Sequence, residues 1–160
     1  MSVAFAREES AELAQEVALP DRPISPYPNL VTASGLKALQ AAEAAANAAV
    51  ESARLIEDPG ERRRALEHAE RDFRYFHERL LTAQLRPAPM SHATVAFGAT
   101  VTIEREGGRK LTYRIVGEDE AEPRQGSISY VAPLARALMG KAVGELIELD
   151  GHEIEILKIA

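Results

Sequence analysis

Six charged side chains gather in one short stretch near the middle of the chain, three of them acids and three of them arginines. In chain order they are Glu57, Asp58, Glu61, Arg62, Arg63 and Arg64. Carboxylates can stabilise the start of a helix or supply oxygen ligands to a hard cation, and guanidinium groups can contact phosphate oxygens. The stretch is therefore the part of the sequence in which polar chemistry is most concentrated.

Each half of this cluster also has a purely structural explanation. Asp58 followed by Pro59 and Glu61 is the pattern of a helix N-cap, with proline at the first helical position and an acid at the capping-box position. The arginines would then cover a solvated helix surface. The two uses are compatible, because a capping carboxylate at an exposed position keeps a second oxygen. Glu57 has no capping role in this pattern.

Two long amphipathic segments flank the cluster and predict the elements that position it. Residues 33–57 are rich in Ala and contain no Pro, which favours a helix capped by Thr32 or Ser34. In both segments the apolar positions alternate spacings of three and four. They are Leu39, Ala42, Ala46, Ala49, Ala53 and Ile56 in the first, and Leu66, Ala69, Phe73, Phe76, Leu80 and Ala83 in the second. We therefore expect an antiparallel helical hairpin (coiled coil) over residues 31–86, with the acidic cluster at its tip.

Regions on either side of the hairpin have different patterns. Residues 1–30 are expected to form an extended or disordered N-terminal tail, because prolines occupy positions 20, 23, 26 and 28, although Ser10–Val17 could form a short helix. The segment Arg86–Pro89 is typical of a linker. Residues 87–160 alternate with a period of two, and they carry hairpin-turn pairs at Gly107-Gly108 and Asp150-Gly151.

The C-terminal pattern predicts six strands and one short helix. The strands are expected at 94–97, 99–105, 110–116, 127–131, 145–149 and 152–159, and the helix at 134–139. The predicted fold class is therefore α+β: an N-terminal helical hairpin followed by a small antiparallel sheet with one helix packed on it.

Composition excludes several classes of function. The 160 residues carry a net charge of −6, which argues against non-specific wrapping of nucleic acid. No Cys is present, so disulfides and Cys-based zinc sites are impossible. We find no zinc-ligand spacing among the four His residues, no Gly-rich phosphate loop and no nucleophile context. With no apolar run of the ~18 residues that a membrane helix needs and no signal peptide, we expect a cytoplasmic protein with no intrinsic enzyme site.

Three blocks in the C-terminal part follow the order of a known family's signatures. They are residues 95–103 (VAFGATVTI), 113–121 (YRIVGEDEA), and Ile128-Ser129 with 132–141 (APLARALMGK). They resemble the C-terminal domain of the bacterial Gre-type (GreA/GreB) transcription elongation factors, and residues 29–36 and 83–85 resemble the two ends of that family's hairpin. The resemblance implies an FKBP-like fold for residues 87–160, without implying prolyl isomerase activity.

RNA polymerase is the partner that this resemblance implies. In the family, the hairpin enters the secondary channel of the polymerase, and acids at its tip help to hold the second catalytic Mg²⁺ for cleavage of backtracked RNA. Glu57, Asp58 and Glu61 are the matching candidates here. The cofactor expectation is therefore no intrinsic metal, with Mg²⁺ only shared with the polymerase, and any cleavage would be catalysed by the polymerase. Arg62, Arg63 and Arg64 would contact the polymerase or the nascent RNA 3′ end, and a monomer is expected because the hairpin satisfies its own apolar stripes.

A second implied site lies in the C-terminal domain. The segment from residue 129 to residue 141 resembles the region that contacts polymerase in the family, although it also reads as the strand and helix needed to close the sheet. The candidate docking residues are Ser129, Tyr130, Pro133, Arg136 and Lys141.

The hairpin departs from the family pattern in two ways. No literal tip motif is present, and each arm is shorter than in family members by about two turns, or roughly 10 Å of reach. This leaves a second function open: a Rnk-like or inhibitory regulator that binds polymerase without stimulating transcript cleavage.

Overall fold

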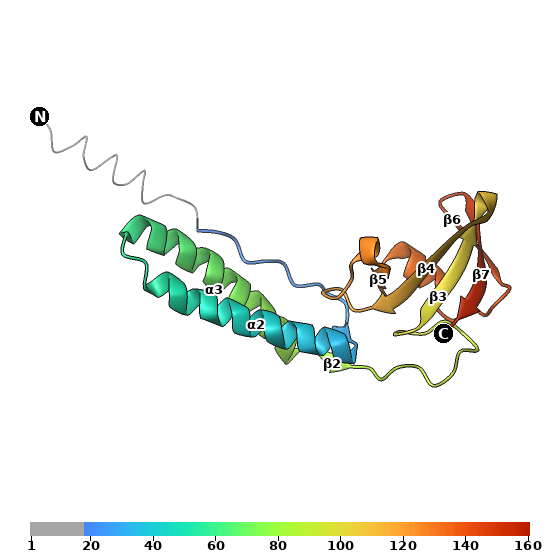
Figure 1. Cartoon of the computed structure of the whole chain (residues 1–160), viewed down its shortest axis with the longest axis horizontal. Coiled ribbons are helices and arrows are strands. Elements are labelled where there is room, and N and C mark those ends of the chain that lie inside the picture. The colour runs from blue at the N-terminus through green and yellow to red at the C-terminus, as the bar shows by residue number, and fades with distance from the viewer. Residues whose placement is uncertain (1–17) are drawn as a thin grey trace, which may run out of the picture.

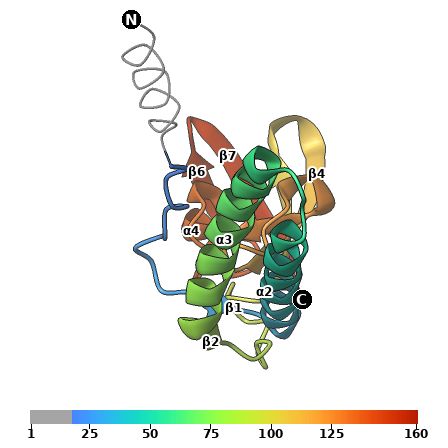
Figure 2. The ribbon, with the colours of Figure 1, turned by 90° about the vertical axis from the view of Figure 1, so that its left-hand side faces the viewer.

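The computed structural model describes residues 18–160, and the expected short helix over Ser10–Val17 lies outside the described residues. The molecule is elongated, with a helical hairpin at one end and a small sheet domain at the other (Figure 1). Figure 2 shows the two hairpin helices side by side in front of the sheet domain. The predicted α+β fold class is confirmed.

Helices α2 (Ala33–Arg54) and α3 (Pro59–Leu81) form the antiparallel hairpin. Thr32 caps α2, because its side-chain oxygen accepts a hydrogen bond from the N–H of Gly35 at 3.0 Å. The arms contain 22 and 23 residues, which at ~1.5 Å per residue gives each a length of roughly 33–35 Å. Helix α2 ends three residues before the expected boundary at residue 57, so Ile56 lies in the tip loop.

The apolar stripe of α2 differs from the expected one near the tip. Leu39, Ala46 and Ala53 are buried as expected, but Ala49 is exposed and its neighbour Val50 is buried in its place. Ala46 and Ala53 are seven residues apart, so Ala49 and Val50 lie on opposite sides of the line between them, about 100° from each other around the helix. Burying Val50 against α3 removes more apolar surface from water than burying Ala49 would.

A short parallel ladder, which the sequence analysis did not anticipate, closes the base of the hairpin. Strand β1 (Leu30–Val31) pairs with β2 (Gln84–Leu85), so the segment entering α2 and the segment leaving α3 are held side by side. The buried side chain of Asn29 adds a bond across the same base, since its Nδ2 donates to the carbonyl oxygen of Arg79 at 2.6 Å.

The C-terminal domain is a five-stranded sheet with one helix. Its strands are β3 (Thr100–Arg105), β4 (Arg109–Val116), β5 (Ser127–Ser129), β6 (Leu146–Leu149) and β7 (His152–Ile159), in the order β5-β4-β3-β7-β6. Short 3₁₀ turns, η1 (Glu106–Gly108) and η2 (Pro123–Gln125), precede β4 and β5. Helix α4 (Pro133–Leu138) packs against the sheet through Ala135 and Leu138, both fully buried.

Two details correct the expected sheet. The edge strand β5 pairs with β4 in parallel, so the sheet is not purely antiparallel. Residues 94–97 form no strand: the N–H of Val95 donates to the carbonyl oxygen of Lys141 at 2.8 Å, and the carbonyl oxygen of Val95 accepts from Gly140 at 2.8 Å. These backbone groups therefore bind the loop after α4 and not a neighbouring strand. The turn between β6 and β7 is as expected, with positive φ at both Asp150 and Gly151.

Candidate functional site

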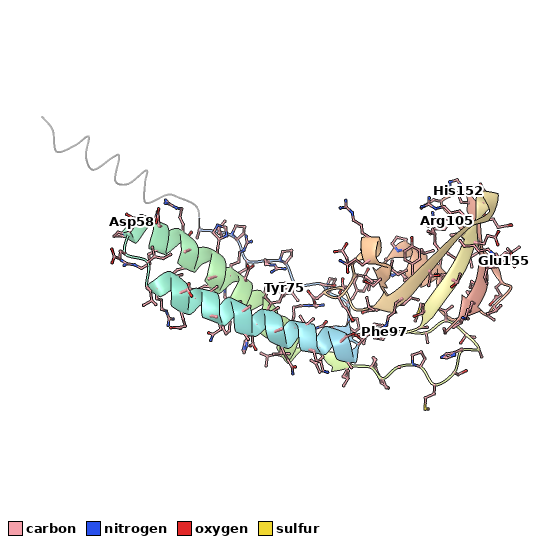
Figure 3. All side chains as sticks on the ribbon, viewed as in Figure 1. Asp58, Tyr75, Phe97, Arg105, His152 and Glu155 are labelled. Atoms are coloured by element: carbon pink, nitrogen blue, oxygen red, sulfur yellow. The ribbon has the colours of Figure 1, made fainter. Side chains whose placement is uncertain are left out.

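The three candidate acids lie together at the far end of the hairpin, where Figure 3 labels Asp58. Asp58 is the N-cap of α3, and its Oδ2 accepts a hydrogen bond from the N–H of Glu61 at 2.8 Å. Glu57, Asp58 and Glu61 are all exposed to solvent. The capping prediction is therefore confirmed, and the cap leaves all three carboxylates at the surface of the tip.

A large apolar side chain, which the sequence analysis did not single out, shares the tip with these acids. Leu55 follows the last residue of α2 and is 83% exposed. The sequence did contain a signal for this exposed leucine, because Leu55 lies just outside the apolar stripe and next to the predicted end of the helix. The tip thus presents an aliphatic side chain beside carboxylates.

The arginine triad divides into two roles. Arg62 is half-buried, and its Nη1 donates to the carbonyl oxygen of Ile56 at 3.1 Å, so it closes the tip loop. Arg63 and Arg64 are exposed on the first turns of α3. Of the three candidates for contact with RNA or polymerase, Arg62 therefore has a structural task as well.

The candidate docking residues lie along β5, α4 and the loop that follows. Tyr130 is half-buried: its ring packs edge-on against Phe97 with centroids 5.8 Å apart, and its hydroxyl donates to the carbonyl oxygen of Pro28. Burial of the Tyr130 hydroxyl is the main cause that raises its pKa above the usual value. Ser129 is half-buried, and Pro133 and Arg136 are exposed.

Lys141 stands apart from the other docking candidates. It lies in the loop after α4, where its Nζ is 3.8 Å from Glu145 and its backbone binds Val95 and Leu138. Ser129, Tyr130, Pro133 and Arg136 thus lie along one stretch of β5 and α4, and Lys141 belongs to the neighbouring loop.

A buried ion pair fixes the direction in which the hairpin leaves the C-terminal domain. Arg79, near the end of α3, is 2% exposed, and its Nε donates to Oδ2 of Asp119 at 2.5 Å. Glu118 lies 3.9 Å from the same guanidinium group. The other oxygen of Asp119 accepts from the hydroxyl of Tyr75 at 2.5 Å. One carboxylate of the sheet domain therefore binds two side chains of α3.

Tyr75 lies outside the apolar stripe predicted for the second helix, and the structure gives it a definite place. Its pKa is raised to about 12, first because burial disfavours the phenolate, and then because the hydroxyl donates to the Asp119 carboxylate. The protonated hydroxyl is thus the form that the folded protein holds.

The start of α2 is attached to the same acidic loop. Both oxygens of Glu120 accept hydrogen bonds at 2.5 Å, one from the hydroxyl of Thr32 and the other from that of Ser34. Gly117 makes the close approach possible, since a Cβ at this position would lie 2.2 Å from the carbonyl oxygen of Leu30. The sequence analysis used residues 113–121 only as a family block, although the three consecutive acids within it, residues 118–120, were a usable signal.

Residues 90–160 match the family described as "Transcription elongation factor, GreA/GreB, C-term". The transcription elongation factor GreA of Alkalilimnicola ehrlichii is 44% identical over 70 residues, which cover 41% of this chain and 44% of that protein. GreA of an Anaeromyxobacter species is 54% identical over 71 residues, covering 41% of this chain and 43% of that protein. Residues 90–160 are therefore similar to the C-terminal domain of GreA/GreB transcription elongation factors.

The match to these GreA proteins spans less than half of their length. Among solved structures, GreA factor homolog 1 of Thermus thermophilus aligns with 84% of this chain and 99% of its own, at 19% identity and a TM-score of 0.40. The GreA/GreB protein of Nitrosomonas europaea aligns with 84% of this chain and 98% of its own, at 16% identity and a TM-score of 0.41. At these scores the two likenesses add nothing to the assignment.

The GreA/GreB match covers only one of the two candidate sites. The docking residues and the acidic loop 118–120 lie inside residues 90–160, whereas the hairpin tip lies outside them. Within residues 18–160, no group of three or more His, Cys, Asp or Glu side chains is arranged to hold a metal ion. No helix in this part of the chain is long and apolar enough to cross a membrane.

Proposed function

We propose that this protein binds RNA polymerase and regulates transcript elongation in the manner of a Gre-type factor. The observation that carries the proposal is the GreA/GreB C-terminal domain at residues 90–160, attached through a buried ion pair to a helical hairpin that ends in exposed acids. Such a role implies the cytoplasm as the compartment and a monomer as the acting species.

In this proposal the C-terminal domain, for which the family resemblance implies an FKBP-like fold, docks through the surface around Tyr130, Pro133 and Arg136. The hairpin then projects into the secondary channel of the polymerase. Its usable length is roughly 33–35 Å, because both arms are continuous helices of 22 and 23 residues. The ion pair between Arg79 and Asp119 matters for function because a rod can reach a buried site only if its direction is fixed.

Glu57, Asp58 and Glu61 are proposed to act on the polymerase active site and not as a separate catalytic centre. Mg²⁺, when shared with the polymerase, would stabilise the charge that develops on the attacking and leaving oxygens of RNA hydrolysis. The residues of this chain present hard oxygen ligands at an exposed tip, and Asp58 also keeps the first turn of α3 in place. Exposed Arg63 and Arg64 support a contact with the phosphates of the nascent RNA 3′ end.

Cleavage of RNA in backtracked elongation complexes tests the proposal. Two variants remove tip charge without removing the cap: Glu57→Ala combined with Glu61→Ala, and Asp58→Asn, in which the amide oxygen still caps the helix. Glu70→Ala is the matched control, because Glu70 is an exposed acid farther along α3. Polymerase binding is measured for each variant alongside 3′-end cleavage.

The outcomes separate the parts of the proposal. Cleavage that is stimulated by the natural protein, lost in the tip variants and kept in Glu70→Ala, with binding unchanged, supports it. Binding without stimulated cleavage would overturn the role of the tip acids and leave a Rnk-like or inhibitory regulator. Absence of binding would overturn the polymerase proposal as a whole.

A further inference from the structure

An extended segment on the N-terminal side of the hairpin crosses both parts of the molecule. Residues 18–28, which we call the strap, run beside α3 and then reach the C-terminal domain (Figure 1). We propose that the strap is an intramolecular cover, which occupies the docking surface of the C-terminal domain and must detach before a partner can bind there. The identity of that partner as RNA polymerase rests on the function proposed above.

One end of the strap is fastened to α3 by two charged residues. Arg22 lies over the ring of Tyr75, 3.8 Å from its centroid, and its Nη1 is 3.1 Å from Oδ1 of Asp72. Asp21 accepts two hydrogen bonds from the guanidinium group of Arg74, at 2.9 Å from Nε and 2.7 Å from Nη2. A stacked guanidinium and a two-bond ion pair give the strap a defined register on the helix.

The other end of the strap lies on two of the four docking candidates of β5 and α4. The carbonyl oxygen of Pro28 accepts the hydrogen bond of the Tyr130 hydroxyl. The ring of Tyr27 lies under the guanidinium group of Arg136, with 4.8 Å between the guanidinium carbon and the ring centroid. A partner that used Tyr130 and Arg136 would therefore have to displace Tyr27 and Pro28.

The nature of these contacts favours a removable cover over a permanent part of the fold. Residues 18–27 form no backbone–backbone hydrogen bond with other described residues, so no ladder has to be broken when the strap leaves. The ion pairs to Asp72 and Arg74 are partly exposed, which keeps each of them weak. Prolines at positions 20, 23, 26 and 28 keep the segment extended even when it is detached, so these weak contacts are enough to hold it on the surface.

The test uses the full chain with Arg22→Ala and Tyr27→Ala combined, which removes one fastening from each end. Arg54→Ala is the control, because Arg54 is an exposed arginine paired with Glu51 at the far end of the hairpin. Losing a stacked cation and an ion pair at partly exposed sites should raise the fraction of molecules with a detached strap by about five- to tenfold. Hydroxyl-radical footprinting of Tyr130 and Arg136 should rise in the same variant, without any partner present.

Binding to RNA polymerase is then measured separately. The strap variant should bind more tightly than the natural protein, by a factor similar to the rise in the detached fraction, and Arg54→Ala should bind as the natural protein does. Unchanged footprinting of Tyr130 would overturn the cover. Increased footprinting with equal or weaker polymerase binding would also overturn it, by showing that the strap contributes to the interface. If no form of the protein binds polymerase, the proposed function fails, and footprinting alone then decides whether Tyr130 and Arg136 are masked.

Discussion

The two partners of the buried ion pair should respond unequally to removal. Asp119→Ala leaves the guanidinium group of Arg79, which is 2% exposed, with only Glu118 at 3.9 Å. Arg79→Met leaves the carboxylate of Asp119, whose side chain is 16% exposed and still accepts from Tyr75. Water can reach that carboxylate but cannot reach the guanidinium group. We therefore expect Asp119→Ala to be the more destabilising change.

The magnitudes follow from the same burial. Breaking a buried ion pair on one side costs about 3–5 kcal/mol, and the lost hydrogen bond of the Tyr75 hydroxyl adds about 1 kcal/mol. Asp119→Ala should fall at the lower end of this range because Glu118 remains nearby, so its loss of stability is about 3–4 kcal/mol. Arg79→Met leaves a carboxylate that water can partly hydrate, so its loss of stability is only about 1–2 kcal/mol. For a chain of this size the difference corresponds to a gap in Tm of roughly 4–8 °C.

Thermal unfolding followed by circular dichroism at the helical band measures both variants. The double variant Arg79→Met with Asp119→Ala removes both charges, so it should be less destabilised than the sum of the two single variants. Three results would refute this reasoning: equal losses of stability in the two single variants, a larger loss in Arg79→Met, or strict additivity in the double variant. Each would show that the buried guanidinium group does not dominate the energy of the ion pair between the hairpin and the C-terminal domain.

Three further predictions concern the hairpin tip and the contact between the hairpin and the C-terminal domain. Gly117→Ala should loosen the contact with Leu30, because its Cβ would lie 2.2 Å from that carbonyl oxygen, and small-angle scattering should show a broader range of hairpin orientations while the sheet stays folded. At the tip, Asp58→Ala should destabilise the hairpin by about 1 kcal/mol in urea unfolding, whereas Asp58→Asn should cost only a small part of that. The raised pKa of Tyr75, about 12, means that its contribution is fully present below pH 10 and is lost as pH rises towards 12. Tyr75→Phe should therefore flatten the fall of stability in that window, and an unchanged slope would contradict the contact with Asp119.

Local patterns in the sequence were enough to predict the hairpin and most of the sheet. The stripe from Leu39 to Ala53, the cap at Asp58 and the turn at Asp150-Gly151 all depend on residues a few positions apart, and the structure contains them. The exchange of Ala49 for Val50 shows the limit of this reasoning, because both residues border the stripe and only the packing against α3 decides which of them is buried.

Long-range contacts could not be predicted in the same way. Residues 94–97 alternate like a strand, but their backbone partners are Gly140 and Lys141, which no local pattern indicates. The pairing of Arg79 with Asp119 joins two parts of the chain, and an arginine on a mostly polar helix gives no sign that it is buried. The candidate docking residues could be named by resemblance, but the contact of Pro28 with Tyr130 depends on how an extended segment crosses the finished fold.

Acidic side chains have different roles in the loop of the C-terminal domain and at the hairpin tip, and the surroundings of each side chain determine its role. Asp119 and Glu120 accept hydrogen bonds from hairpin side chains at 2.5 Å, and these bonds hold the hairpin in one direction relative to the C-terminal domain. Glu57 and Glu61 are exposed at the tip, where their charge remains available to a cation or to a partner. Removing the loop acids should therefore misdirect the hairpin while leaving the tip intact, and removing the tip acids should leave the direction unchanged. Both kinds of variant should weaken stimulated cleavage, but only the loop-acid variants should alter the orientation of the hairpin in small-angle scattering. That result would show that orienting the hairpin and acting at its tip are separate functions of acidic residues in this protein.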